Sequence, residues 1–94
     1  MPEPFDTETV DTALLGLPGW QRDGITIRKE YTFGDFASAF GFMARMAITS
    51  EAMNHHPDWS NSWNRVVVVL TSHDAAGVTQ RDIDWAQQAE AAAG

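Results

Sequence analysis

The longest helical candidate, residues 35–53, is the feature that most restricts how this chain can fold. One apolar stripe recurs along it at helical spacing: Phe36, Phe40, Met43, Ala47. A second apolar stripe runs beside the first: Ala39, Phe42, Met46, Met53. A helix that is apolar nearly all round is usually buried on two sides. We therefore expect one side to pack on the domain's own core and the other to form a subunit interface; the alternative is a single thick core that takes up both stripes.

Two shorter patterns precede this helix. Residues 6–16 predict a first helix, which Asp6 or Thr7 can cap and which has apolar residues at helical spacing. Residues 20–33 predict a β-hairpin, because Asp23-Gly24 is a favoured two-residue turn and β-branched and aromatic residues alternate beyond it.

Further strand and helix patterns follow it. Residues 59–62 predict a short strand or turn, and residues 64–72 predict a strand whose apolar run indicates burial on both faces or an edge paired in an oligomer. Thr79 and Asp82 have the spacing of a capping box at the start of a final helix. The order αββαββα predicts an α+β fold, with a four-stranded antiparallel sheet and its helices packed on one face. We expect residues 1–94 to form a single domain.

Composition narrows the classes of partner. The net charge is −7, from six basic and thirteen acidic residues, which argues against binding to nucleic acid or to an anionic membrane surface. The chain has no cysteine, so it has neither disulfides nor a thiolate metal site. The N-terminal sequence does not resemble a signal peptide, and the longest apolar run is too short to span a bilayer. We expect a cytoplasmic protein that binds a small ligand or another protein.

The segment EAMNHHPDW carries the most distinctive chemistry. It places His55 and His56 side by side, and His73 follows the strand predicted at residues 64–72. Glu51 precedes His55 by four residues, so on a helix it would reach that imidazole and orient it. Histidine is the usual general acid or base near neutral pH. Pro57 and Trp59 would add a flat apolar wall suited to a planar heterocycle.

Two other kinds of site fit the sequence less well. Adjacent histidines are a poor chelate, although Glu51 and His55 have a metal-compatible spacing. A nucleophilic triad needs an activated Ser, Thr or Cys, and the chain has neither cysteine nor a GxSxG elbow. Acid–base chemistry without a metal is therefore the interpretation we carry forward.

Taken in order, these motifs resemble the pterin-4a-carbinolamine dehydratase family. The matching segments are EAMNHHPDW, then WNRVVVVLTSHDAAGVTQRDIDWA, and upstream GWQRDGITIRKEYTFGDFASAFGFMARMA. The resemblance covers the chain from about Leu14 to Ala89. Trp63 stands where the family commonly has Tyr, and Ser72 where it more often has Thr.

The resemblance implies a hydro-lyase that works without a cofactor or metal. Members dehydrate 4a-hydroxytetrahydropterin, the product of aromatic amino acid hydroxylases, to the quinonoid dihydropterin in tetrahydrobiopterin recycling. Carried over to this chain, the resemblance implies His55 and His73 as the acid–base pair, His56 as a pterin-holding group and Glu51 as the residue that orients His55. It also implies a set of pocket-lining positions: Asn54, Pro57, Trp59, Thr71, Ser72, Asp82.

Family members assemble as dimers or tetramers, which agrees with the two apolar stripes of residues 35–53. The rival hypothesis is a non-catalytic binding or assembly module that keeps the fold and docks partners on the long helix. The intact set of Glu51 and three histidines favours the enzyme, because a module without catalytic demand would be free to lose any of them. A metal-dependent hydrolase ranks last.

Overall fold

The computed structural model describes residues 3–94 and has the predicted αββαββα order. Its helices are α1 (Thr7–Leu14), α2 (Phe36–Met53) and α3 (Gln80–Ala93), and a short 3₁₀ helix, η1 (His73–Ala75), precedes α3. The strands are β1 (Gln21–Asp23), β2 (Thr26–Thr32), β3 (Asp58–Ser62) and β4 (Arg65–Leu70). All neighbouring strands are antiparallel, in the order β1-β2-β4-β3. The predicted fold class is confirmed.

The helices begin where their sequences indicate, although α1 ends at Leu14, before the predicted stop at Gly16. Asp6 accepts a hydrogen bond from the Thr9 amide at the start of α1, as one of the two proposed caps. The Asp35 side chain accepts a hydrogen bond from the Ser38 amide at the start of α2. The capping box of Thr79 and Asp82 begins α3. Each cap satisfies amide donors that the first helical turn leaves free.

The β1–β2 hairpin differs from its prediction by one residue. Asp23 pairs with Thr26, so the two turn residues are Gly24 and Ile25 rather than Asp23 and Gly24. Gly24 has a φ of 60°, as the first central residue of a type II′ turn requires. A turn at Asp23-Gly24 would instead place Asp23 at positive φ, which costs more for a residue with a side chain.

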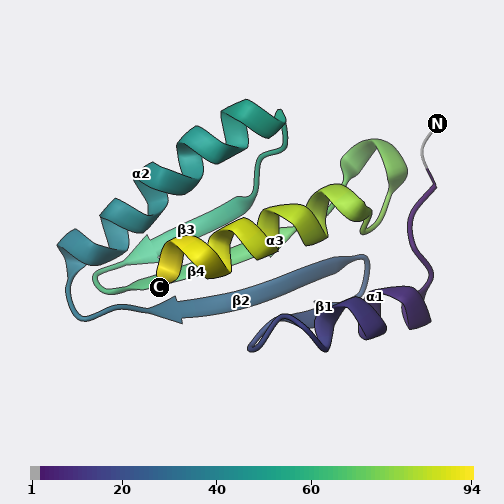
Figure 1. The fold of residues 1–94 in the computed structure, drawn as a ribbon, viewed down its shortest axis with the longest axis horizontal. Coiled ribbons are helices and arrows are strands. Elements are labelled where there is room, and N and C mark those ends of the chain that lie inside the picture. The colour runs from purple at the N-terminus through teal and green to yellow at the C-terminus, as the bar shows by residue number, and fades with distance from the viewer. Residues whose placement is uncertain (1–2) are drawn as a thin grey trace.

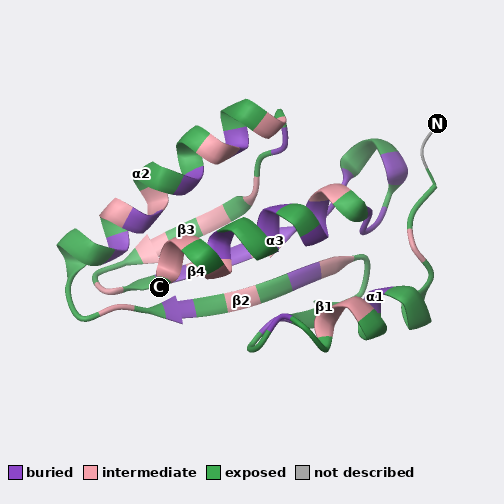
Figure 2. Ribbon diagram, viewed as in Figure 1, coloured by how far each residue is buried: buried purple, intermediate pink, exposed green. Residues whose placement is uncertain are grey.

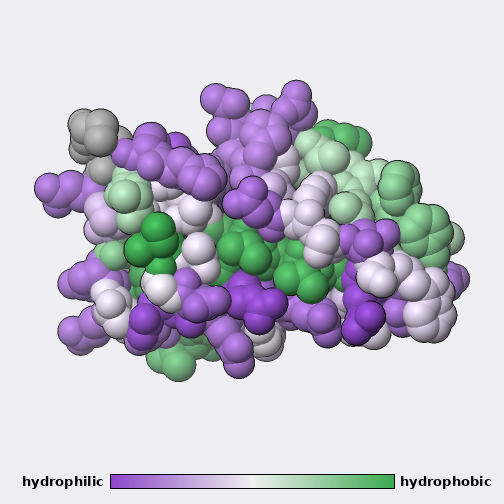
Figure 3. Space-filling view, turned by 180° about the vertical axis from the view of Figure 1, so that it is seen from behind, coloured by the Kyte–Doolittle hydropathy of each residue, from purple (hydrophilic) through white to green (hydrophobic). Residues whose placement is uncertain are grey.

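One face of the sheet carries the core. Val66, Val68 and Leu70 of β4 are fully buried, and Ile27 and Tyr31 of β2 lie on the same face. α2 and α3 pack against each other over that face, as Figures 1 and 2 show. The opposite face is uncovered, and Figure 3 shows hydrophobic side chains gathered over its middle among polar ones.

β4 therefore does not match either alternative expected for its apolar run. It lies between β2 and β3, so it is an inner strand rather than an edge. Val67 and Val69 point to the uncovered face and are only half-buried in the single chain. The edges of the sheet are β1 and β3.

A polar cluster ties α3 to the sheet away from the histidines. The Glu90 carboxylate accepts hydrogen bonds from Lys29 Nζ at 2.8 Å and from the Tyr31 hydroxyl at 2.5 Å. Lys29 Nζ also donates to the Pro18 carbonyl. Burial, with the hydrogen bond to Glu90, raises the pKa of Tyr31 well above its usual value. Within residues 3–94, no helix is long and apolar enough to cross a membrane.

Candidate active site

The end of α2 sends the two adjacent histidines in different directions. Asn54 has a φ of 50°, and the amides of Asn54 and His55 donate to the carbonyls of Glu51 and Ser50, at 3.2 and 3.0 Å. This is a Schellman ending, which needs a left-handed residue, and Asn adopts that conformation more readily than most side chains. The turn leaves the His55 side chain only 7% exposed, whereas the His56 side chain is 54% exposed.

His55 is held by a buried carboxylate. Its Nε2 lies 2.5 Å from Oδ1 of Asp82, a residue with no exposed surface. The other Asp82 oxygen accepts from the Ser72 hydroxyl and from the Thr79 amide, both at 2.9 Å. A carboxylate can only accept hydrogen bonds, so the proton of this contact belongs to His55 Nε2. Nδ1 is then the nitrogen left to exchange a proton with a ligand.

Glu51 contacts the other histidine of the pair. Its Oε2 lies 2.5 Å from His56 Nε2, and both side chains are largely exposed. The expectation that Glu51 orients His55 is therefore wrong. Asn54 leaves the helical conformation before His55 is reached, so the helical i, i+4 spacing no longer applies across this turn.

His73 begins η1, directly after the segment that follows β4. Its side chain is 80% exposed, and its Nε2 lies 4.0 Å from Oδ2 of Asp58, the first residue of β3. Asp58 follows the HHP segment immediately, so His73 faces the stretch of chain that carries the other two histidines. All three histidines belong to segments at the end of the sheet where α2 and β4 end and where β3 and α3 begin (Figure 1).

An exposed ion pair braces the segment that carries His73. Arg81 Nη2 donates to Asp74 Oδ1 at 2.5 Å, which links η1 to the first turn of α3. This hydrogen bond from Arg81 holds the pKa of Asp74 below its usual value. The carboxylate therefore stays charged, and the pair stays intact, across the neutral pH range.

The pocket-lining positions divide into two groups. Asn54 is exposed, and Pro57 and Trp59, which follow the two histidines in the chain, are half-buried, with Trp59 edge-on to Trp85 at 6.1 Å between ring centroids. The second group is buried and bonded within the protein: Thr71, Ser72, Asp82.

Ligand contact by this second group stays a prediction, and the structure shows which protein groups these side chains bond. The Thr71 hydroxyl donates to the Ile25 carbonyl at 2.7 Å, and Ser72 bonds Asp82. Their polar atoms are buried and hydrogen-bonded within the protein.

Sequence reasoning missed the link between His55 and the start of α3. The capping box identified Thr79 and Asp82 as a helix start, and nothing in their spacing signals a third partner 27 residues earlier. The available signal was that an acidic side chain which caps a helix retains a free oxygen, and a buried histidine needs an acceptor. Within residues 3–94, no group of three or more His, Asp or Glu side chains is arranged to hold a metal ion.

Comparison with known proteins gives one consistent family. The model of the family described as pterin 4 alpha carbinolamine dehydratase matches residues 3–92. A protein of Rhizorhabdus wittichii, provisionally named pterin-4-alpha-carbinolamine dehydratase, is 46% identical over 97% of this chain and 96% of its own length. A protein of Nitrobacter winogradskyi with the same provisional name is 50% identical over 99% of this chain and 94% of its own length.

Solved structures agree with the fold. A crystal structure from Brucella melitensis, described as a transcriptional coactivator/pterin dehydratase, superposes with a TM-score of 0.95 at 40% identity and covers 98% of this chain and 100% of its own. A pterin dehydratase-like protein, described as a RuBisCO assembly factor in the alpha-carboxysome, shares the fold with a TM-score of 0.67 at 22% identity, over 80% of this chain and 87% of its own. By its sequence and its fold, this chain belongs to the pterin-4-alpha-carbinolamine dehydratase family.

Proposed function

We propose that this chain is a hydro-lyase that converts 4a-hydroxytetrahydropterin to quinonoid dihydropterin and water. The observation that carries the proposal is the buried His55–Asp82 pair beside two exposed histidines. Membership of the family gives the substrate class. The site supplies imidazoles, and histidine is the side chain that most often serves as a general acid or base.

The reaction requires two coordinated proton transfers. The bond between C4a and its hydroxyl oxygen breaks, and an acid donates a proton so that the oxygen leaves as water. A base removes a proton from a ring nitrogen, and the electron pair left behind forms the new double bond to C4a. We assign these roles to His55 and His73 without fixing which is the acid. Because the step eliminates water with no net oxidation or reduction and transfers no group to another molecule, the proposed reaction needs neither a cofactor nor a metal.

The other site residues hold the reactants in place. We propose that His56 holds the pterin and that Glu51 orients His56 rather than His55, because their side chains are in contact. Asp82 acts on His55 through its hydrogen bond and does not touch the substrate. Pro57 and Trp59 provide the apolar wall for the flat ring.

The first experiment is a direct rate measurement. An aromatic amino acid hydroxylase generates the 4a-hydroxytetrahydropterin, and ultraviolet absorbance follows its dehydration with and without this protein. We expect a rate that rises in proportion to protein concentration and is unaffected by a chelator. A folded protein that dehydrates the pterin no faster than buffer would overturn the proposal. Such a hydroxylase would have to share a compartment with this protein, which we propose is the cytoplasm.

A second candidate function rests on the exposed face of α2. Phe36, Phe40 and Ile48 are 50%, 58% and 73% exposed, although they are large and apolar. We propose that this face joins copies of the chain into a dimer or tetramer, in keeping with the two apolar stripes of the helix. As an alternative to catalysis, the same face would serve a non-catalytic assembly module.

Oligomeric state tests the role of this face. Analytical ultracentrifugation of wild type should give a mass above that of one chain, and Ile48→Glu should lower it, because a charge at a packed apolar contact is costly. Glu8→Gln, at an exposed residue of α1, is the control that leaves α2 unchanged. A monomeric wild type would contradict the assembly.

A further inference from the structure

The His73 loop, residues 72–79, is closed and tightly anchored. The Ser72 amide donates to the Gly77 carbonyl at 2.9 Å, so the two ends of the η1 turn are bridged. On the inner side the Ser72 hydroxyl bonds Asp82. Ala76 has a φ of 54°, a conformation that few residues with side chains adopt. The loop is therefore held in one strained shape with His73 exposed upon it.

A second anchor reaches this loop from the other end of the chain. The N-terminal arm, Pro4–Phe5, crosses the outer side of the loop, where the Phe5 amide donates to the Val78 carbonyl at 2.8 Å. Pro4 lies so close to Gly77 that a Cβ on Gly77 would come within 2.7 Å of the Pro4 Cβ. The Phe5 side chain packs against the core, which fixes the arm in place.

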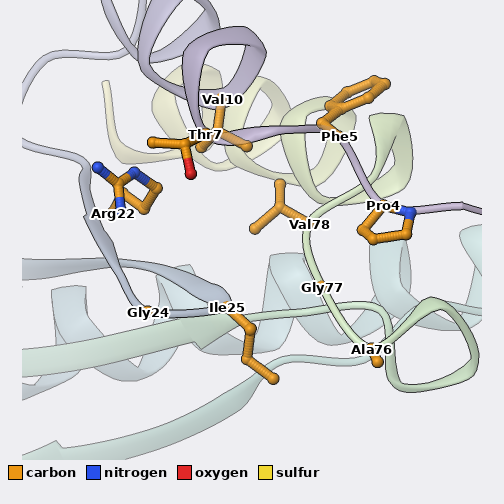
Figure 4. A pocket seen from close by; sticks show the side chains of 10 residues that line it. All are labelled: Pro4, Phe5, Thr7, Val10, Arg22, Gly24, Ile25, Ala76, Gly77 and Val78. Atoms are coloured by element: carbon orange, nitrogen blue, oxygen red, sulfur yellow. The ribbon is translucent and has the colours of Figure 1, made fainter.

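The space beside the arm is open. A hollow of about 130 Å³ lies between the arm, the β1–β2 turn and residues 76–78 (Figure 4). Figure 4 shows the Pro4 ring directed toward Gly77 and the Val78 side chain directed into the hollow. The contacts of the arm with the loop include the Phe5–Val78 hydrogen bond and the close approach of Pro4 to Gly77.

We infer that the N-terminal arm is a positioning element for His73, because it holds the outer side of the loop while Ser72 holds the inner side. The inference rests on the proposed dehydratase function, in which His73 transfers a proton. Small errors in the placement of a proton-transfer group slow the chemical step sharply. The arm does not touch the substrate, so its loss should lower kcat more than it changes KM.

Gly77→Ala is the most selective perturbation. Its new methyl group would collide with Pro4 and push the arm off the loop, whereas the backbone at Gly77 is one that Ala can adopt. We expect kcat to fall roughly tenfold, as for a modest misplacement of a catalytic group. Gly34→Ala is the matched control, because a Cβ at Gly34 meets nothing within 4 Å. That variant should keep the wild-type kcat.

The His73→Ala background separates positioning from general damage. If the arm acts through His73, Gly77→Ala should cause no further loss of kcat once the imidazole is absent. An equal loss in both backgrounds, or a folded Gly77→Ala protein with wild-type kcat, would overturn the inference. Should Gly77→Ala fail to fold, Pro4→Gly applies the same test from the arm, at an exposed residue whose replacement leaves the core intact.

Amide hydrogen exchange tests the inference without reference to catalysis. Pro4→Gly should speed exchange at Ala75 and Gly77 by about tenfold, because the loop opens more often without the arm. Amides of α2 should exchange at the wild-type rate. Unchanged exchange in the loop would refute the inference even if the dehydratase is confirmed. Faster exchange in a protein without dehydratase activity would refute the proposed function and leave the arm's structural role in place.

Discussion

Replacing Asp82 by Asn exchanges one buried carboxylate oxygen for an NH₂ group and leaves the shape of the side chain unchanged. In wild type one oxygen faces His55 Nε2, and the other faces the Thr79 amide and the Ser72 hydroxyl. The Thr79 amide can only donate, so it keeps the Asn oxygen on its side. The NH₂ group must then face His55.

This orientation forces a change at the imidazole. An NH₂ group can only donate, so His55 Nε2 has to become an acceptor and the ring proton moves to Nδ1. In the neutral ring, the nitrogen proposed to face the substrate then carries the proton that Nε2 carries in wild type. Hydrogen bonds to charged groups contribute about 1.5–3 kcal/mol each, so we expect a loss of that order in the free energy of unfolding. We expect kcat to fall roughly 10²–10⁴-fold, the usual contribution of a positioned acid or base.

Three measurements check this reasoning. Nitrogen-15 NMR of the ring nitrogens identifies which nitrogen of His55 carries the proton, urea denaturation gives the free energy of unfolding, and the absorbance assay gives kcat. Asp84→Asn, an exposed position on the same helix, makes the same charge change without touching His55. If Asp82→Asn keeps its proton on His55 Nε2, or keeps the wild-type kcat, the assignment of Asp82 is refuted.

Three further predictions concern stability and binding. The indole N–H of Trp85 lies 2.9 Å from the Ser50 hydroxyl, so Ser50→Ala leaves this buried donor without an acceptor. Urea denaturation should then show a loss of about 1–3 kcal/mol in the free energy of unfolding. Burial raises the pKa of Glu90, but its hydrogen bonds lower the pKa by more, so the pKa in the folded protein lies below 4.5. The contribution of Glu90 to the stability of the fold is therefore complete above pH 4.5 and is lost as the pH falls through the folded pKa. Glu90→Gln should therefore flatten the acid side of a stability–pH curve. Glu51→Gln, at an exposed pair with His56, should change the free energy of unfolding by less than about 1 kcal/mol and raise KM more than it lowers kcat.

Ser50→Ala and Glu90→Gln each have a matched control. Ser38→Ala removes an exposed hydroxyl from the same helix as Ser50 and should be nearly neutral, since no buried donor depends on it. Glu30→Gln removes an exposed carboxylate from β2 and should leave the acid side of the curve unchanged. Equal losses in the free energy of unfolding for Ser50→Ala and Ser38→Ala would contradict the role given to the Ser50 hydroxyl. Parallel stability–pH curves for Glu90→Gln and wild type would contradict the role given to Glu90.

The fold was largely predictable because its signals are local. Asp35 and the capping box at Thr79 mark helix starts through contacts that span three residues. The hairpin was predictable because a glycine separates two segments in which β-branched and aromatic residues alternate, and only the position of its turn was wrong, by one residue. β4 was harder, because an apolar run does not distinguish an inner strand with one uncovered face from a strand buried on both faces.

The sequence named the candidate residues but did not indicate which of them contact one another. The histidines and Glu51 were identified, but which imidazole Glu51 reaches depends on the left-handed conformation of Asn54. The contact between His55 and Asp82 joins segments far apart in the chain, and so does that between Phe5 and Val78. Such contacts depend on how α3 packs over the sheet, which no local pattern specifies.

The central claim is that His55 and His73 act together as the acid and base of a pterin dehydratase. Its most direct test compares the dehydration rates of wild type, His55→Ala, His73→Ala and the double variant, each shown to be folded by circular dichroism. We predict that each single variant loses roughly 10²–10⁴-fold in kcat and that the double variant loses little more, because groups that act as a unit are not additive. Wild-type rates in both single variants would contradict the claim.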